Sequence, residues 1–259
     1  MGLWIAAASF LVLTGIAAYV VTGRNVPAPK PAAAEPEHST APQPSPQPLG
    51  GEAAEIALPP VDKADELVRQ LVTKISSSPS VAAWLATDGL IRSFTSGVLN
   101  VAEGKVPVGQ LHVMRPTLPL QVVEQGGDVI IDARSYERYD ALAAAAASFD
   151  PAGSARLYGT MKPRIEEAYR ELGADEAVFD RVLERAIVLL LETPVVDGAV
   201  QVEPHGIGYA FAAPNLENLM PVQKQLLRTG PRNVRRVQAS LREIATALGI
   251  PASRLPARR

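Results

Sequence analysis

The chain of 259 residues is 47% hydrophobic and carries a net charge of −2, which allows one globular domain of about 200 residues with accessory segments. It contains no cysteine, so disulfides, thiolate metal ligands and cysteine nucleophiles are excluded. A chain without cysteine suits an oxidising or a reducing compartment equally well. The small net charge hides an asymmetry: residues 222–259 hold nine basic and one acidic residue, and residues 59–221 hold 14 basic and 22 acidic residues. Such a basic end can pack on its own acidic body, so it does not by itself require an external polyanion.

The chain opens with an uninterrupted apolar run. Residues 3–21 contain no charge and no proline, and a helix of this length spans about 28 Å, close to the ~30 Å hydrocarbon thickness of a bilayer. A secretory signal peptide has a charged start and a shorter apolar run, so we expect an uncleaved transmembrane anchor over residues 1–22. Arg24 and Lys30 follow this anchor, and the positive-inside rule then favours a cytoplasmic domain.

A tether rich in proline, alanine and serine is expected to follow, over residues 23–57. It has no aromatic residue and cannot bury enough apolar surface to offset the entropy of ordering the chain. Its prolines favour extended polyproline II segments. The tether is therefore predicted to be a disordered, semi-stiff spacer, with a Pro-rich docking ligand as the alternative.

A globular domain is predicted over residues 58–249, followed by a basic tail over residues 250–259. One hairpin is expected around Gly126-Gly127-Asp128, and a second either around Asp197-Gly198 or over Pro204 to Gly208. Capping residues and apolar spacing predict helices that start at or just after Asp62, Pro79, Asp88, Asp132, Asp150, Asp175, Pro221 and Pro231. The expected fold is mainly α: a compact multi-helix domain with one or two small β-hairpins, preceded by a single transmembrane helix and a disordered tether.

The last predicted helix, residues 231–248, is amphipathic. Its apolar residues recur at a 3-4-3-4 spacing on one side, and its arginines fall on the other. The inward residues are Val234, Val237, Leu241, Ile244 and Leu248, and the outward residues are Arg232, Arg235, Arg236 and Arg242. With Arg228 on the preceding short helix, these arginines form a candidate binding surface.

Three interpretations of this basic surface are open. It is a face that is solvated or paired with the domain's own acids, a patch for anionic lipid headgroups, or a contact for the phosphates of nucleic acid. Residues 221–259 contain no Phe, Tyr, Trp or His, which excludes stacking on bases, so no specific nucleic-acid partner is expected. The predicted anchor is what motivates the lipid interpretation.

The stretch "SYERYD", residues 135–140, concentrates two tyrosines, an arginine and two acids. Tyr136 and Tyr139 are three residues apart and join an apolar stripe, so they are expected to be core residues whose hydroxyls find polar partners. The alternative is a ligand-binding cleft lined by the two tyrosines and Arg138.

Motifs for catalysis are scarce. His38, His112 and His205 stand in no paired ligand spacing, so neither a metal nor a cofactor is expected. Glycan-cleaving enzymes need only two carboxylates, and Glu167 and Glu171 share a helix face at i, i+4. These two residues or Asp140 are candidates for a carboxylate pair, and the competing interpretation is a solvated acidic face.

Several blocks of the sequence resemble, in order, those of a bacterial family of membrane-anchored proteins catalogued as domain of unknown function 3014. The blocks are "VAAWLATDGLIRSF", "SYERYD", "SFDPAGSARLYGTMKPRIEEAYRELG", "LLLETPVV" and "LENLMPVQKQLLRTGPRNVRRVQASL". The similarity runs from about Leu58 to Leu248. It implies an envelope-anchored bacterial protein with no assigned activity. Arg232 stands where the family pattern leads us to expect an acidic residue, so the patch is more basic here than is usual in the family.

The resemblance and the stiff tether favour a periplasmic domain on the inner membrane, against the charge count. The expected function is a single-pass envelope protein with a non-enzymatic interaction or scaffold module. It would contact the lipid bilayer through residues 3–21 and bind another envelope protein. The alternatives are an envelope hydrolase or transferase that uses a carboxylate pair, and attachment to an anionic surface through the arginines.

Overall fold

A computed structural model describes residues 48–174 and 178–257 of the chain. The chain divides into two units, residues 1–45 and 46–259, and all described residues belong to the second. The predicted anchor, most of the predicted tether and the helix start predicted at Asp175 lie outside the described residues. Among the residues that are described, no helix is long and apolar enough to cross a membrane.

The second unit is mainly helical and has two small antiparallel hairpins, so this part of the predicted fold is confirmed. The α-helices are α1 (Asp65–Val72), α2 (Pro79–Leu85), α3 (Leu90–Ala102), α4 (Asp140–Ala146), α5 (Pro151–Glu171), α6 (Phe179–Leu191), α7 (Pro214–Glu217), α8 (Pro221–Leu227) and α9 (Pro231–Ala247). The strands are β1 (Val122–Gln125), β2 (Asp128–Ile131), β3 (Val202–His205) and β4 (Gly208–Phe211). Short 3-10 helices are η1 (Val61–Lys63), η2 (His112–Met114), η3 (Ala133–Tyr139) and η4 (Ala252–Arg254).

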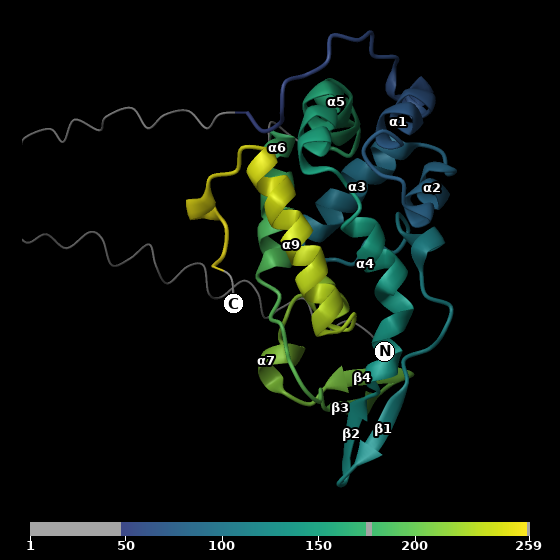
Figure 1. The fold of residues 1–259 in the computed structure, drawn as a ribbon, viewed down its shortest axis with the longest axis vertical. Coiled ribbons are helices and arrows are strands. Elements are labelled where there is room, and N and C mark those ends of the chain that lie inside the picture. The colour runs from purple at the N-terminus through teal and green to yellow at the C-terminus, as the bar shows by residue number, and fades with distance from the viewer. Residues whose placement is uncertain (1–47, 175–177, 258–259) are drawn as a thin grey trace, which may run out of the picture. The chain divides into compact units, whose positions relative to one another are not determined.

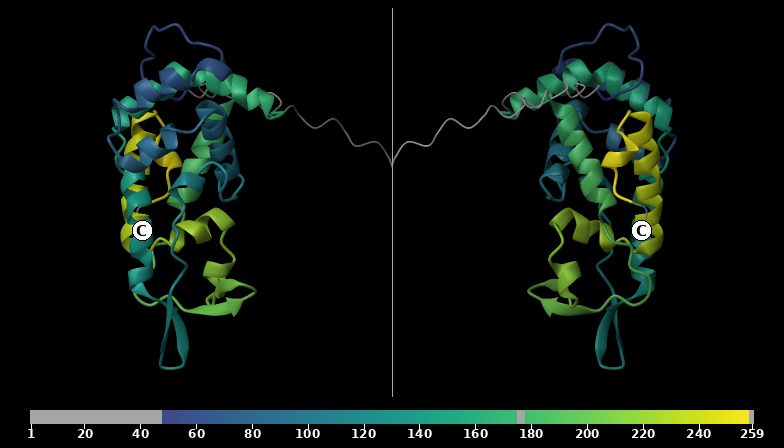
Figure 2. Two further views of the ribbon diagram at one scale, coloured as in Figure 1. Left: turned by 90° about the vertical axis from the view of Figure 1, so that its right-hand side faces the viewer. Right: turned by 90° about the vertical axis from the view of Figure 1, so that its left-hand side faces the viewer.

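Most of the helices gather at one end of this unit, and the hairpins project from the other with α7 beside them (Figure 1, Figure 2). α3 packs between α5 and α6, and α9 runs along α4, α5 and α6. Phe179, at the start of α6, is fully buried in the main core. Its ring centroid lies 6.2 Å from that of Phe94, 6.5 Å from that of Tyr158 and 5.3 Å from that of Tyr169, so three helices meet on one aromatic cluster.

Two of the predicted helix caps are confirmed and two are wrong. The carboxylates of Asp132 and Asp150 accept backbone N–H groups at the starts of η3 and α5. By contrast, the first N–H groups of α3 donate to Asp65 on α1, at 2.7 and 2.9 Å, and not to the predicted cap Asp88. Asp62 lies within η1 and binds Arg92 at 2.5 Å. Local spacing could not show either contact, because each partner comes from another element.

The two hairpins join into one lobe with its own small core. β1 pairs with β2 around Gly126-Gly127 as predicted, and β3 pairs with β4 across residues 206–207, so the second predicted position is confirmed and the Asp197-Gly198 position is wrong. The backbone N–H of Ile131 donates to the carbonyl of Val200 at 3.0 Å, which links the hairpins. The residues of this core are Ile131, Val200, Val202, Phe211, Leu216 and Leu227.

Among the described residues, packing is already present at Leu49, nine residues before the boundary expected at 58. The Leu49 side chain is buried in the main core, and its backbone N–H donates to the carboxylate of Asp180 at 2.9 Å. The next N–H, that of Gly50, donates to the carbonyl of Leu248 at 3.0 Å. Residues 49–51 are therefore bound to the domain, and we call them the entry segment.

The entry segment lies close against α5 because the glycines at this contact have no side chain. The N–H of Gly51 donates to the carbonyl of Ala155 at 2.8 Å, which brings the carbonyl oxygen of Gly51 close to Gly159 on the helix. A Cβ atom added at Gly159 would lie 2.5 Å from that oxygen, closer than real contacts allow. The composition predicted that the spacer continues through these residues. Glycines in both the entry segment and α5 instead make close backbone approach possible.

Candidate functional site

The segment "SYERYD" packs against the turn between α8 and α9, which we call the elbow (Thr229, Gly230 and Pro231). Gly230 has a φ of +84°, a region that L side chains avoid. A Cβ atom at this position would lie 2.4 Å from Cγ of Tyr136. The glycine therefore both turns the chain and lets the tyrosine ring lie flat against it.

Polar contacts fix this packing. The Tyr139 hydroxyl accepts a hydrogen bond from the Gln225 amide at 2.9 Å. The Asn233 amide donates to the Asp140 carboxylate at 2.9 Å, and Arg232 forms an ion pair with the same carboxylate. The hydrogen bond from Arg232 is the main cause that lowers the pKa of Asp140, with a further contribution from Asn233. Two segments that the sequence separates by about 90 residues thus form one structure.

Beside the elbow lies a small hollow of about 190 Å³, lined by Tyr136, Glu137, Arg232 and Asn233 among others. Tyr136 is half-buried, and burial raises the pKa of its hydroxyl. Tyr139 is 6% exposed and belongs to the interior. Tyr139 is therefore an interior residue with a bonded hydroxyl, whereas Tyr136 lines the hollow.

Arg138 and Arg228, which come from η3 and from the end of α8, each stack on an aromatic ring. The Arg138 guanidinium lies 4.7 Å from the ring centroid of Tyr139 and donates to the carbonyl of Leu118 at 3.0 Å. The Arg228 guanidinium lies 4.7 Å from the ring centroid of Phe211. Arg228 is half-buried, so it is set apart from the outward arginines of α9.

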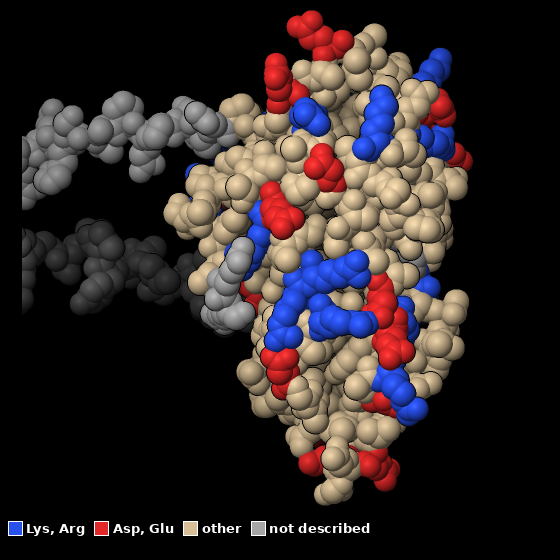
Figure 3. Space-filling view, viewed as in Figure 1, with Lys and Arg blue, Asp and Glu red and all other residues tan. Residues whose placement is uncertain are grey.

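Three predicted outward arginines do lie on the exposed face of α9, and we call Arg232, Arg235 and Arg236 the arginine face. In Figure 3, Lys and Arg side chains gather over the N-terminal half of α9, with acidic side chains on both sides of them. The acids that pair with the face are Asp140, with Arg232, and Asp197, with Arg235. The basic surface is therefore mixed in charge.

Arg242, which was predicted to share this face, instead binds the C-terminal tail. Its guanidinium donates to the carbonyls of Pro256 at 2.6 Å and Ala257 at 3.2 Å. Tail residue Arg254 adds an ion pair with Glu184 at 3.2 Å. The tail, predicted only as basic, is thus bound back on α6 and α9 as far as the structure describes it.

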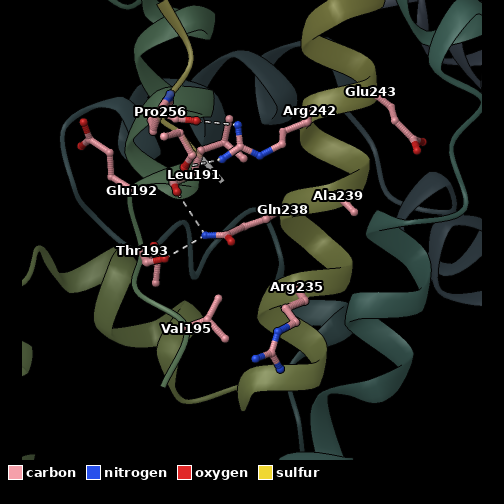
Figure 4. Close-up of a pocket in the computed structure, with 11 residues that line it drawn as sticks. Leu191, Glu192, Thr193, Val195, Arg235, Gln238, Ala239, Arg242, Glu243 and Pro256 are labelled. Atoms are coloured by element: carbon pink, nitrogen blue, oxygen red, sulfur yellow. Dashed lines mark hydrogen bonds between the residues drawn. The ribbon is translucent and has the colours of Figure 1, made fainter. Parts of the chain in front are cut away.

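A groove of about 730 Å³ lies between α9, the end of α6 and the tail (Figure 4). Arg235, Gln238 and Arg242 point from α9 across to the opposite wall. The Gln238 amide donates to the carbonyl of Thr193 at 2.8 Å and, more weakly, to the last carbonyls of α6. Gln238 therefore links α9 to the carbonyl groups at and just beyond the end of α6.

The two carboxylates of the candidate pair each bind a different arginine. Glu167 pairs with Arg164 at 2.6 Å, while Glu171 accepts two hydrogen bonds from Arg92 at 2.6 and 2.9 Å. The hydrogen bond from Arg92 is the main cause that lowers the pKa of Glu171. A general acid at neutral pH needs a raised pKa, and Glu171 is shifted the opposite way.

A buried charge cluster escaped the sequence reasoning. Asp180 on α6 is 9% exposed, and its carboxylate accepts the Tyr158 hydroxyl at 2.6 Å, Lys162 at 2.5 Å and the Leu49 N–H. Burial is the main cause that raises the pKa of Tyr158, and the bond to Asp180 adds to it. We call Asp180, Tyr158 and Lys162 the buried cluster. The one sequence signal for this cluster is the position of Asp180 on an otherwise apolar helix face.

No group of three His, Asp or Glu side chains that could hold a metal ion occurs within the described ranges. The His112 ring instead lies 2.8 Å from the carbonyl of Gly109.

The family model described as "Protein of unknown function (DUF3014)" matches residues 90–245, more than half of the chain. The match runs from the start of α3 almost to the end of α9, so it contains the "SYERYD" segment, the elbow and the arginine face. No curated protein and no solved structure matches the chain. The chain belongs to the family described as protein of unknown function DUF3014.

Proposed function

We propose that the chain is a membrane-anchored envelope protein whose helical domain is an interaction module, with the arginine face as its binding surface. The observation that carries this proposal is the alternation of charge: Arg232 pairs with Asp140, Arg235 pairs with Asp197, and Arg236 is exposed beside them. Alternating charges give a surface that discriminates between partners, because a partner must match each sign in place.

The same alternation favours a protein over an anionic membrane as the partner. A lipid surface attracts a polybasic cluster through summed positive charge, and the acids beside the arginine face cancel much of that charge. An exposed ion pair contributes little free energy. On binding, a protein partner can therefore replace one or both of the carboxylates that now pair with the arginine face.

A photo-crosslinking residue at Ala239, which is exposed next to the arginine face, tests the proposal. In cells, we expect a defined adduct that disappears when Arg232, Arg235 and Arg236 are replaced together by Glu, because the reversed charges repel the partner. The measurement is the mass and identity of the adduct after purification of the chain from membranes.

The matched control reverses a single exposed charge at Lys74, which lies in the loop after α1, and should leave the adduct unchanged. An adduct that survives reversal of the whole arginine face would contradict the proposal. Salt-dependent binding of the chain to anionic liposomes, lost in the triple Glu variant, would instead support attachment to a membrane surface.

The membrane anchor and the periplasmic location of the domain are also part of this proposal. Residues 3–21 have the length and apolarity of a bilayer span, and the tether suits a domain held away from an inner membrane on its periplasmic side. A reporter enzyme that is active only outside the cytoplasm, fused after Arg259, is expected to be active. If only a reporter that works in the cytoplasm gives signal at this position, the domain faces inward and the periplasmic part of the proposal is wrong.

The hydrolase alternative gains no support from the contacts of its candidate residues. Asp140, Glu167 and Glu171 are each bound to a different arginine. The pKa of Asp140 and that of Glu171 are both lowered by their arginine partners.

A further inference from the structure

One face of α9 forms a side of the groove that lies between α6, α9 and the C-terminal tail (Figure 4). The residues of α9 that line it recur at helical spacing: Arg235, Gln238, Ala239, Arg242 and Glu243. Ala239 lies at the centre of this face and is exposed, so its short side chain leaves room above the helix. The groove volume of about 730 Å³ lies within the range of about 300–1,000 Å³ that is typical of ligand sites.

The opposite wall carries backbone groups that a peptide can pair with. This wall is the irregular segment after α6, which includes Val195. Val195 and Val196 are half-buried, and their N–H and C=O groups form no hydrogen bond with another backbone group among the described residues. Water satisfies such groups until a ligand replaces it. The wall can therefore bind the main chain of a peptide, a mode that gives affinity in several peptide-binding domains.

The groove already holds one chain segment by its backbone. Both terminal nitrogens of the Arg242 guanidinium donate to successive carbonyls of the tail, that of Pro256 at 2.6 Å and that of Ala257 at 3.2 Å. Pro256 and Ala257 belong to neither a helix nor a strand, and both line the groove. The α9 side of the groove thus recognises peptide carbonyls.

Arg235 adds a position for a carboxylate. It lines the groove and also belongs to the arginine face, so the two surfaces are continuous. Its partner is Asp197, whose side chain is 69% exposed, and an exposed pair of this kind contributes little free energy. A carboxylate on a ligand in the groove can therefore replace Asp197 on Arg235.

We propose that the groove binds an extended peptide segment of the partner protein, with an acidic side chain of that segment on Arg235. Main-chain hydrogen bonds to Val195 and Val196 give affinity, and the acidic side chain gives specificity. This inference rests on the proposed function, because Arg235 is part of the arginine face. It goes further by naming the structural element that the partner presents.

The probe is a phage-displayed library of short random linear peptides, selected on the full chain purified in detergent. We expect the selected peptides to share an Asp or Glu, and the fluorescence anisotropy of a labelled peptide then measures its affinity. Val195→Glu places a negative charge in the groove and should weaken binding at least about tenfold, because like charges repel. Val108→Glu is the matched control, since Val108 is exposed in a loop that does not line the groove, and its affinity should equal that of the native chain.

Two further exchanges test the carboxylate contact. Asp197→Ala removes the internal competitor and should tighten peptide binding up to about fivefold, the most that an exposed pair contributes. Replacing the acid of the peptide by its amide should weaken binding to the native chain but not to Arg235→Gln. These readouts decide the case if Val195→Glu does not fold. N-methylation along the peptide, which removes main-chain donors, should also weaken binding.

A library that yields no peptide sensitive to Val195→Glu, or selected peptides without a preference for an acid, would overturn the inference. If the library fails while the adduct at Ala239 forms in cells and depends on the arginine face, the inference is wrong and the proposed function stands. A groove peptide with the expected responses, but no adduct in cells, would support the inference and contradict the proposed function.

Discussion

Replacement of Asp180 by Ala is expected to lower the free energy of unfolding by about 3–5 kcal/mol, the range for breaking a buried ion pair. The change leaves Lys162 without its carboxylate, and the side chain of Lys162 is only 21% exposed. It also removes the acceptor for the Tyr158 hydroxyl and for the N–H of Leu49, so the entry segment loses one of the three hydrogen bonds that its N–H groups donate. Urea unfolding of the full chain, followed by circular dichroism, measures the effect.

Asp197→Ala is the matched control for this experiment. Asp197 also pairs with a basic residue, Arg235, but its side chain is 69% exposed. An exposed pair contributes at most about 1 kcal/mol, so the control should unfold almost like the native chain. Equal destabilisation by the two substitutions would mean that the buried cluster is not a structural centre. Asp180→Asn, which keeps an acceptor but no charge, should fall between the control and Asp180→Ala.

Gly230→Ala is expected to destabilise the domain by about 2–4 kcal/mol, as the sum of a positive-φ strain and an overpacking term. The new Cβ would lie 2.4, 2.7 and 2.8 Å from three atoms of Tyr136, so the elbow and the "SYERYD" segment must separate. Thermal and urea unfolding give the size of the loss. The spectrum of Tyr136 in the near-ultraviolet should change with it.

Gly249→Ala isolates the strain term, because Gly249 has a similar φ of +87° but nothing within 4 Å of an added Cβ. We expect it to lose only about 1–2 kcal/mol. A double variant, Gly230→Ala with Tyr136→Ala, should lose less than the two single losses combined, since the shorter side chain removes the two closest contacts and leaves only that of its Cβ. Strict additivity would show that the close approach of Gly230 and Tyr136 does not matter for stability.

Periodicity and turn chemistry predicted most of the elements. Pro231 begins α9 and Gly230 precedes it as expected, because a missing N–H and a positive φ act within one or two residues. Contacts between distant elements were harder to predict. Leu172 continues the apolar spacing of α5, but it is 47% exposed, since it lies just beyond the last residue of that helix, Glu171.

The sequence predicted the two parts of the candidate site only separately. Tyr136, Arg138 and Tyr139 formed one candidate and the basic stretch formed another, each from its own composition. The structure joins them through Arg232 and Asp140, which are separated by 92 positions in the sequence. A single sequence carries no signal for such a pairing. The buried cluster was missed for the same reason, because the partners of Asp180 come from α5 and from the entry segment.

The entry segment also ties the beginning of the domain to its end. Gly50 binds the carbonyl of Leu248, which lies at the close of α9, so the covalent path from residue 50 to residue 248 is closed into a ring by a hydrogen bond. Tension applied through the preceding chain would therefore load Asp180 and the first half of α5 before it could peel a terminal helix.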